Sequence, residues 1–126
     1  MSRIKGKDTD PELLVRRRLY LQGIRYRLHV NLPGKPDIVV RKSNAAVFIN
    51  GCFWHSHRNC RESRLPKSNV KFWRSKIKAN VQRDRKNYQL LEEAGWRVMV
   101  VWQCELDKDR EEILRGITTF VSKIAK

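Results

Sequence analysis

Cysteine and histidine side chains gather in one short segment of the chain. The stretch FINGCFWHSHRNC contains Cys52, His57 and Cys60 with the spacing C-x4-H-x2-C, and the only other cysteine is Cys104. Three thiolates and one imidazole form a standard structural zinc set, which is closed and leaves no position for a substrate. The spacing therefore predicts a structural zinc on these four residues. Buried cysteines with incidental histidines are the alternative interpretation.

The predicted zinc site leaves three notable side chains of this segment unused. His55 lies two residues from a predicted ligand, so its position would be fixed, and an imidazole can move protons near neutral pH. Phe53 and Trp54 either cover the core beside the metal or stack on nucleic-acid bases. The chain has 28 basic and 13 acidic residues, for a net charge of +15. Such a surplus favours a polyanionic partner, nucleic acid first, over a basic surface without a dedicated partner.

Asp37 is the carboxylate best placed for metal chemistry. It stands at the start of the apolar run DIVV, directly after a Pro-containing turn. Magnesium often needs only one or two protein carboxylates and keeps several waters, so Asp37 could hold it against a phosphate and thereby activate water. Capping of the turn after Pro36 explains the residue equally well.

Two further carboxylates lie in predicted helices. Asp84 falls on the inward stripe of the second helix and has no lysine or arginine three or four positions away. Either His55 or an arginine from another element would serve as its partner. Glu12 fits a capping box with Thr9, although a first-turn glutamate could still face the site. The inward stripe is expected to contain Trp73, Ile77, Asn80, Asp84, Tyr88 and Leu91.

The elements that must position these residues form one α/β domain, residues 9–126, preceded by a basic, mobile arm at residues 1–8. Helices are expected at 9–23, at 67–95 (with Ser68 as cap and Gly95 as stop) and over the last twenty residues. Strands are expected at 24–30, 37–40, 44–51 and 96–104. This order predicts a mixed central sheet flanked by helices, with 45–51 and 96–102 near its centre and Cys104 ending the last strand.

The sequence also bears on location. The segment MSRIKGKDTD has no apolar run, so we expect neither a signal peptide nor a membrane anchor. Three cysteines cannot all pair within one chain, and the cytoplasm, where we expect the protein, would keep them reduced, which favours metal ligation or plain burial over disulfides.

Four stretches in this order resemble the very short patch repair (Vsr) endonuclease family: PGKPDIVV, VFINGCFWHSHRNC, FWRSKIKANVQRDR and GWRVMVVWQCEL. The resemblance covers the chain from about residue 5 to 106. It implies a type II restriction endonuclease-like core with a structural zinc site. The implied activity is a magnesium-dependent nick 5′ to the thymine of a T·G mismatch in double-stranded DNA.

The resemblance also implies roles for individual residues. Asp37 would bind magnesium together with the backbone carbonyl of Ile49, and His55 would act as base or proton relay. Asp84 would lie near that histidine and Glu12 at the metal edge. The zinc ligands would be the four named above. The aromatic side chains that wedge into DNA beside the mismatch would be Phe53, Trp54 and Trp73.

The chain departs from the family pattern at two places. Ile49 and Asn50 stand where some members have threonine and histidine. Losing the threonine side chain is tolerable if only the carbonyl binds metal, and Asn50 can donate a hydrogen bond at the site but cannot shuttle a proton. The interval from His57 to Cys60 is also one residue longer than in the similar pattern.

The expected partner is mismatched DNA, with other mismatch-repair proteins as further candidates, and nicking one strand requires only a monomer. Two other functions fit parts of the sequence. One is a zinc-stabilised nucleic-acid-binding module without catalysis, which gives no reason for the carboxylates and His55 to converge. The other is a nuclease of the same fold that cuts matched or branched DNA.

Overall fold

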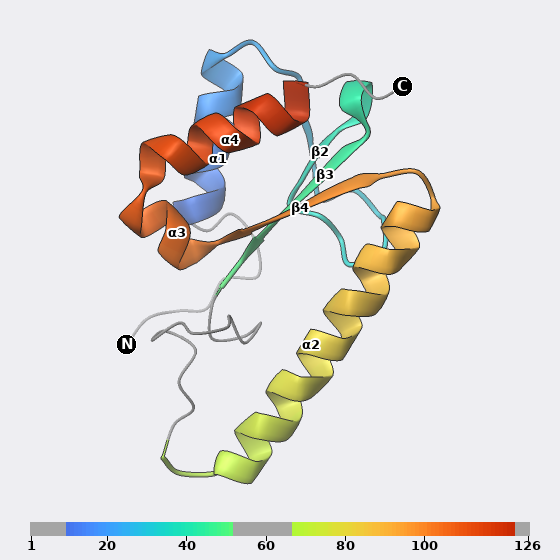
Figure 1. Ribbon diagram of the computed structural model, residues 1–126, viewed down its shortest axis with the longest axis vertical. Coiled ribbons are helices and arrows are strands. Elements are labelled where there is room, and N and C mark those ends of the chain that lie inside the picture. Colours follow the sequence, from blue (N-terminus) through green and yellow to red (C-terminus); the bar gives the residue numbers. More distant parts are fainter. Residues whose placement is uncertain (1–9, 52–66, 123–126) are drawn as a thin grey trace.

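The computed structural model describes residues 10–51 and 67–122, in which helices cover both faces of a mixed sheet (Figure 1). In chain order the elements are α1 (Asp10–Leu21), β1 (Arg27–Leu28), β2 (Ile38–Val40), the short 3-10 helix η1 (Arg41–Ser43), β3 (Ala45–Asn50), α2 (Val70–Glu93), β4 (Arg97–Trp102), α3 (Gln103–Lys108) and α4 (Arg110–Ser122). The predicted α/β class and mixed sheet are confirmed. The predicted arm at 1–8 lies outside the described residues.

The sheet has the strand order β1-β2-β3-β4. Strands β1, β2 and β3 pair antiparallel, and β3 pairs parallel with β4 from Ala45↔Arg97 to Asn50↔Trp102. Strand β3 is central, as expected, and β2 is also internal with all three residues buried. The expectation for β4 is wrong, because this strand lies at the edge of the described sheet and most of its residues are only partly buried.

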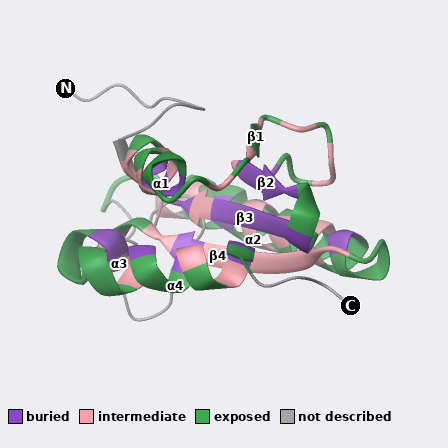
Figure 2. Cartoon of the chain, turned by 90° about the horizontal axis from the view of Figure 1, so that it is seen from above, coloured by how far each residue is buried: buried purple, intermediate pink, exposed green. Residues whose placement is uncertain are grey.

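Strand β3 is buried along most of its length (Figure 2), and its alternate residues pack into two separate cores. Ala45 and Val47 face the side covered by α1, α3 and α4, whereas Ala46 and Phe48 face α2. Each strand side chain points to the opposite face from its neighbour, so a strand that is apolar throughout needs cover on both faces. The inner side of α4 contributes Leu114 and Ile117 to the first core, and Ile113 and Phe120 pack against it.

The long helix α2 carries the predicted inward stripe. All six predicted positions are buried or partly buried: Trp73, Ile77, Asn80, Asp84, Tyr88 and Leu91. The C-terminal part of α2 packs beside the sheet, and its N-terminal half projects well beyond it (Figure 1). The stripe therefore continues from the core past the end of the sheet.

Three local predictions need correction. Only Arg27–Leu28 of the strand expected at 24–30 pairs in the sheet, although burial alternates along the whole segment. The residue before helix α2 is Asn69, whose backbone is in the left-handed conformation and whose side chain makes no capping hydrogen bond. Ser68 is therefore not the cap of this helix. Cys104 does not end β4 but lies in the first turn of α3, where the Trp102 backbone N–H donates to the Glu105 carboxylate at 3.2 Å.

No helix within residues 10–51 and 67–122 combines the length and the apolar character that crossing a membrane requires.

Gly34 fixes the turn that leads into β2. Its φ is +74°, and a Cβ at this position would lie 3.0 Å from Asn87 Cβ and 3.2 Å from Phe48 Cε2. We therefore expect Gly34→Ala to lower the free energy of unfolding by about 2–3 kcal/mol, from backbone strain plus the clash with α2. Chemical denaturation measures this loss.

Gly23 provides a matched control for this substitution. It has the same φ of +74°, but a Cβ there would meet nothing within 4 Å. Gly23→Ala should cost only the strain, about 1 kcal/mol. Equal losses in the two variants would show that the close approach to α2 contributes nothing.

Candidate active site

Asp37 lies between the turn 32–36 and β2, and its carboxylate is fixed by the backbone of β3. The Ile49 N–H donates to Asp37 Oδ2 at 2.7 Å, and the Asp37 N–H donates to the Val47 carbonyl at 3.0 Å. In a strand the N–H and C=O of one residue face the same edge, because paired residues exchange both bonds. The Ile49 carbonyl therefore faces the side on which the Asp37 carboxylate lies. The two residues predicted to hold magnesium meet at the end of the sheet.

Asn50 is the last residue of β3 and is almost fully buried, with 4% of its surface exposed. Its Nδ2 donates to the hydroxyl of Tyr88, on α2, at 3.0 Å. The Tyr88 ring also packs edge-on against Phe48, with 4.9 Å between the ring centroids. Asn50 thus joins the end of β3 to the inward face of α2.

Asp84 lies one helical turn before Tyr88 on the same face of α2. Burial is the main cause that raises the pKa of Tyr88 to about 12, and the negative charges of Asp84 and Asp37 raise it further, against the Asn50 hydrogen bond. Both carboxylates therefore act on one hydroxyl group, from two elements that are 47 residues apart in the sequence. Asp37, Asn50, Asp84 and Tyr88 form what we call the Asp37 cluster.

The raised pKa of Tyr88 makes a spectroscopic prediction. Between pH 10 and about 11, where an ordinary tyrosine ionises, Tyr88 should stay largely protonated. The phenolate absorbance of the wild type minus that of Tyr88→Phe should therefore remain small until the pH approaches 12. Because the pKa of Tyr88 is raised in the folded state, its contribution to the free energy of unfolding is fully present below pH 10 and is lost as the pH rises towards 12. A difference titration with a midpoint near 10 would contradict this environment.

Glu12 is buried in the first turn of α1, with 2% of its surface exposed. Arg16, one turn later, pairs with it across 3.7 Å. Figures 1 and 2 place the beginning of α1 towards the end of the sheet at which β3 ends and α3 begins. The predicted capping partner, Thr9, lies outside the described residues. Glu12 lies in the first turn of this helix, and its proximity to a metal stays a prediction.

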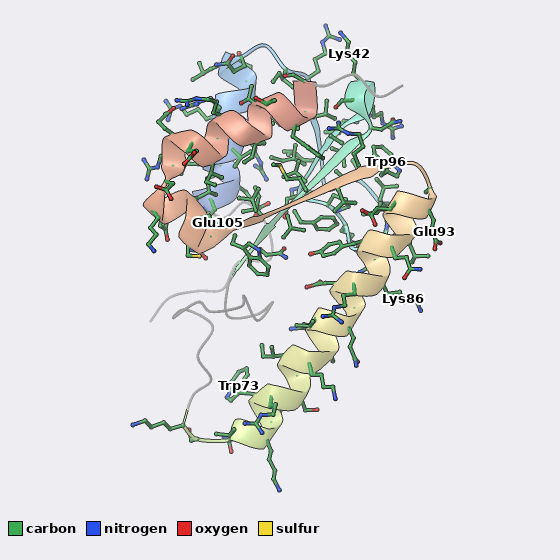
Figure 3. The ribbon with its side chains drawn as sticks, viewed as in Figure 1. Lys42, Trp73, Lys86, Glu93, Trp96 and Glu105 are labelled. Carbon is green, nitrogen blue, oxygen red and sulfur yellow. The ribbon has the colours of Figure 1, made fainter. Side chains whose placement is uncertain are left out.

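Trp73 stands apart from the Asp37 cluster. It projects from the N-terminal half of α2 (Figure 3), eleven residues before Asp84, which is about 16 Å along a helix. Its ring packs edge-on against Phe72 at 5.2 Å, and Phe72 is 58% exposed beneath the Lys76 ammonium. Phe72, Trp73 and Lys76 together form an aromatic and basic surface suited to nucleic acid. The sequence analysis predicts Trp73 for this role but not Phe72.

Six of the predicted site residues fall outside the described residues. Three are predicted zinc ligands, Cys52, His57 and Cys60, and the others are Phe53, Trp54 and His55. Cys104 is described and is half-buried on α3, directly before Glu105, which Figure 3 labels. Within residues 10–51 and 67–122 no group of three or more Cys, His, Asp or Glu residues could hold a metal. A zinc site on Cys104 therefore needs the undescribed segment.

Asp37 and Ile49 together fit a magnesium ion better than a transition metal. Their oxygen donors are one carboxylate and one backbone carbonyl, which is the small, all-oxygen protein contribution that magnesium accepts alongside water. The backbone N–H bonded to Oδ2 orients the carboxylate before any ion binds. A sheet that ends in such a group, in a chain of net charge +15, has the organisation of a nuclease.

Comparison with known proteins gives the family. The family model described as "DNA mismatch endonuclease Vsr" matches residues 1–62. DNA mismatch endonuclease Vsr from Escherichia coli is 40% identical over 114 residues, which cover 90% of this chain and 72% of the relative. The type II nicking enzyme V.NmeAIP from Neisseria meningitidis is 50% identical over 107 residues, covering 84% and 76%. The type II nicking enzyme V.XorIIP from Xanthomonas oryzae is 49% identical over the same length, covering 84% and 78%. The chain belongs to the Vsr family of DNA mismatch endonucleases.

Tyr88 is the member of the Asp37 cluster that the sequence pattern assigns only to the inward stripe of α2 and not to the site. The available signal was its spacing, one turn after Asp84 on the same stripe, which puts a hydroxyl beside a candidate carboxylate. Its contact with Asn50 depends on the packing of α2 against β3 and could not be read from spacing.

Proposed function

We propose that this protein is a magnesium-dependent DNA endonuclease that nicks one strand 5′ to the thymine of a T·G mismatch, as part of mismatch repair. The observation that supports it is the Asp37 cluster. Asp37 and Ile49 meet through a 2.7 Å hydrogen bond, Asn50 is buried beside them, and Asp84 faces the same hydroxyl group as Asp37. The names of the relatives, mismatch endonuclease and nicking enzymes, support cleavage of one strand.

The roles of the residues follow from their chemistry. Asp37 and the Ile49 carbonyl would hold magnesium, which when bound supplies charge stabilisation at the phosphoryl oxygen and an activated water. Asp37 is kept in its orientation by the Ile49 N–H. His55 would accept the proton of the attacking water, and Asp84 would orient that histidine. Asn50 would donate a hydrogen bond to a phosphate oxygen, a role that needs no titrating group.

Binding would rest on charge and on aromatic rings. Lysine and arginine side chains engage the phosphates, so affinity should fall steeply with salt. Trp73, with Phe53 and Trp54, would wedge between bases, which costs less at a mispair than in a matched stack. The position of Trp73 on the projecting half of α2 supports such a reach. We further propose that the four predicted zinc ligands fix the segment that contains Phe53 and Trp54. We also propose that the enzyme acts as a monomer in the cytoplasm.

A panel of substrates tests this function. Duplexes that differ only in carrying T·G, a matched T·A pair or a branch are incubated with and without magnesium, and the cut positions are mapped. We expect one nick, 5′ to the mispaired thymine, only with T·G and magnesium. Equal cutting of matched or branched DNA would replace mismatch repair with another nuclease function. Binding without cutting of any duplex would indicate a non-catalytic DNA-binding module.

A further inference from the structure

The contact between Asn50 and Tyr88 is built into the fold rather than formed at the surface. Asn50 is 4% exposed, and its Nδ2 lies 3.0 Å from the Tyr88 hydroxyl. The Tyr88 ring is itself held by the edge-on contact with Phe48 on β3 and by its place on the inward stripe of α2. A buried amide that loses its partner costs more than the bond itself is worth, so this pair should keep its geometry.

Counting donors and acceptors shows what the contact leaves for the site. A carboxamide is planar and has two N–H donors and one oxygen acceptor. With one N–H directed at Tyr88, the directions of the second N–H and of Oδ1 are fixed as well. The Tyr88 hydroxyl accepts from Asn50 and keeps its own proton, because burial and two nearby carboxylates disfavour the phenolate. It remains a constant partner for Asn50 over the working pH range.

We propose that Tyr88 is a positioning residue of the nicking site, whose hydroxyl fixes the carboxamide of Asn50 so that its second N–H is available to an oxygen of the scissile phosphate. Asn50 follows Ile49, whose carbonyl faces Asp37, so its carboxamide is carried by the strand end that also contributes to the metal site. Tyr88 reaches this strand end from α2 and does not need to touch the substrate. This inference rests on the proposed nuclease function.

Kinetics of Tyr88→Phe test the proposal, since phenylalanine keeps the ring contact with Phe48 and removes only the hydroxyl. We expect kcat to fall about tenfold, the size of one lost hydrogen bond, while KM changes less than about twofold. Asn50→Ala should lose a similar factor. The double variant should be no slower than Asn50→Ala, because the two residues act as one unit. Tyr20→Phe, on the exposed surface of α1, is the matched control and should leave both constants unchanged.

The side-chain amide of Asn50 gives a readout that does not depend on the choice of substrate. In a nitrogen–proton NMR spectrum, Tyr88→Phe should shift or broaden the Asn50 NH2 signals, whereas Tyr20→Phe should not. If these signals stay in place, or if they move while kcat on whatever duplex the wild type cuts is unaffected, Tyr88 does not position Asn50 for catalysis. If the signals move but the wild type nicks no duplex, the Asn50–Tyr88 contact is real and the proposed nuclease function is wrong. The positioning role at a nicking site is then wrong as well, and the NMR result separates this case from a missing contact.

Discussion

Replacing Asp37 with asparagine is expected to reduce the nicking rate at least about a thousandfold while leaving DNA affinity intact or slightly higher. The substitution keeps the size of the side chain, and its amide oxygen can still accept from the Ile49 N–H, so the turn and β2 should retain their structure. It removes the charge on which magnesium binding depends. The metal supplies several kcal/mol of charge stabilisation, and about 4 kcal/mol corresponds to a thousandfold.

Asp107→Asn is the matched control for this loss. Asp107 is exposed on α3, and the substitution makes the same change of one unit in net charge away from the Asp37 cluster. Nicking is measured in single turnover with saturating enzyme, and magnesium binding is measured separately by calorimetry. The proposed metal site would be wrong if Asp37→Asn nicked within tenfold of the wild type, or if it bound magnesium as tightly.

The parts of the fold that the sequence predicted share one property, a regular pattern carried by many residues. The stripe of α2 repeats over more than four turns, so one misread position would not have changed its phase, and Asp84 was correctly placed on it. The run 38–40 is apolar throughout, which indicates an internal strand, and β2 is fully buried. The position of Asp37 directly before this run is equally predictable, whereas its chemical role is not, because capping of the turn after Pro36 explains a carboxylate there equally well.

The parts that could not be predicted depend on contacts between distant segments. The apolar run 96–102 is compatible with a central or an edge strand, because α2 and the helices beyond it cover both faces of β4 either way. The sequence does not predict the short helix α3, because its first residues directly follow the β-forming run of β4. The helix starts where the Trp102 N–H donates to the Glu105 carboxylate. The Asn50–Tyr88 bond joins residues 38 positions apart, and no local spacing encodes it.

The corrected position of Cys104 strengthens the case for a zinc site. Asn50 of β3 is in parallel register with Trp102 of β4, so the chain leaves the two strands side by side. One exit leads through Gly51 into the segment that contains Cys52, His57 and Cys60, and the other places Cys104 two residues after Trp102. This register is compatible with the proposal that Cys52 and Cys104, each two positions after a paired residue, bind the same ion. Tetrahedral zinc would then join the undescribed segment to α3.

Cys104→Ser is therefore expected to remove tightly bound zinc and to lower the free energy of unfolding by at least about 3 kcal/mol, because the energy of binding structural zinc is also folding energy. Metal content is determined by mass spectrometry after dialysis against a chelator, and unfolding is followed by denaturant titration. Gln103→Ser, which introduces the same side chain one residue earlier at an exposed position, should retain both zinc and stability. One equivalent of zinc retained in Cys104→Ser would exclude this thiol as a ligand. The segment that contains Phe53 and Trp54 would then lack the proposed link to α3 through zinc.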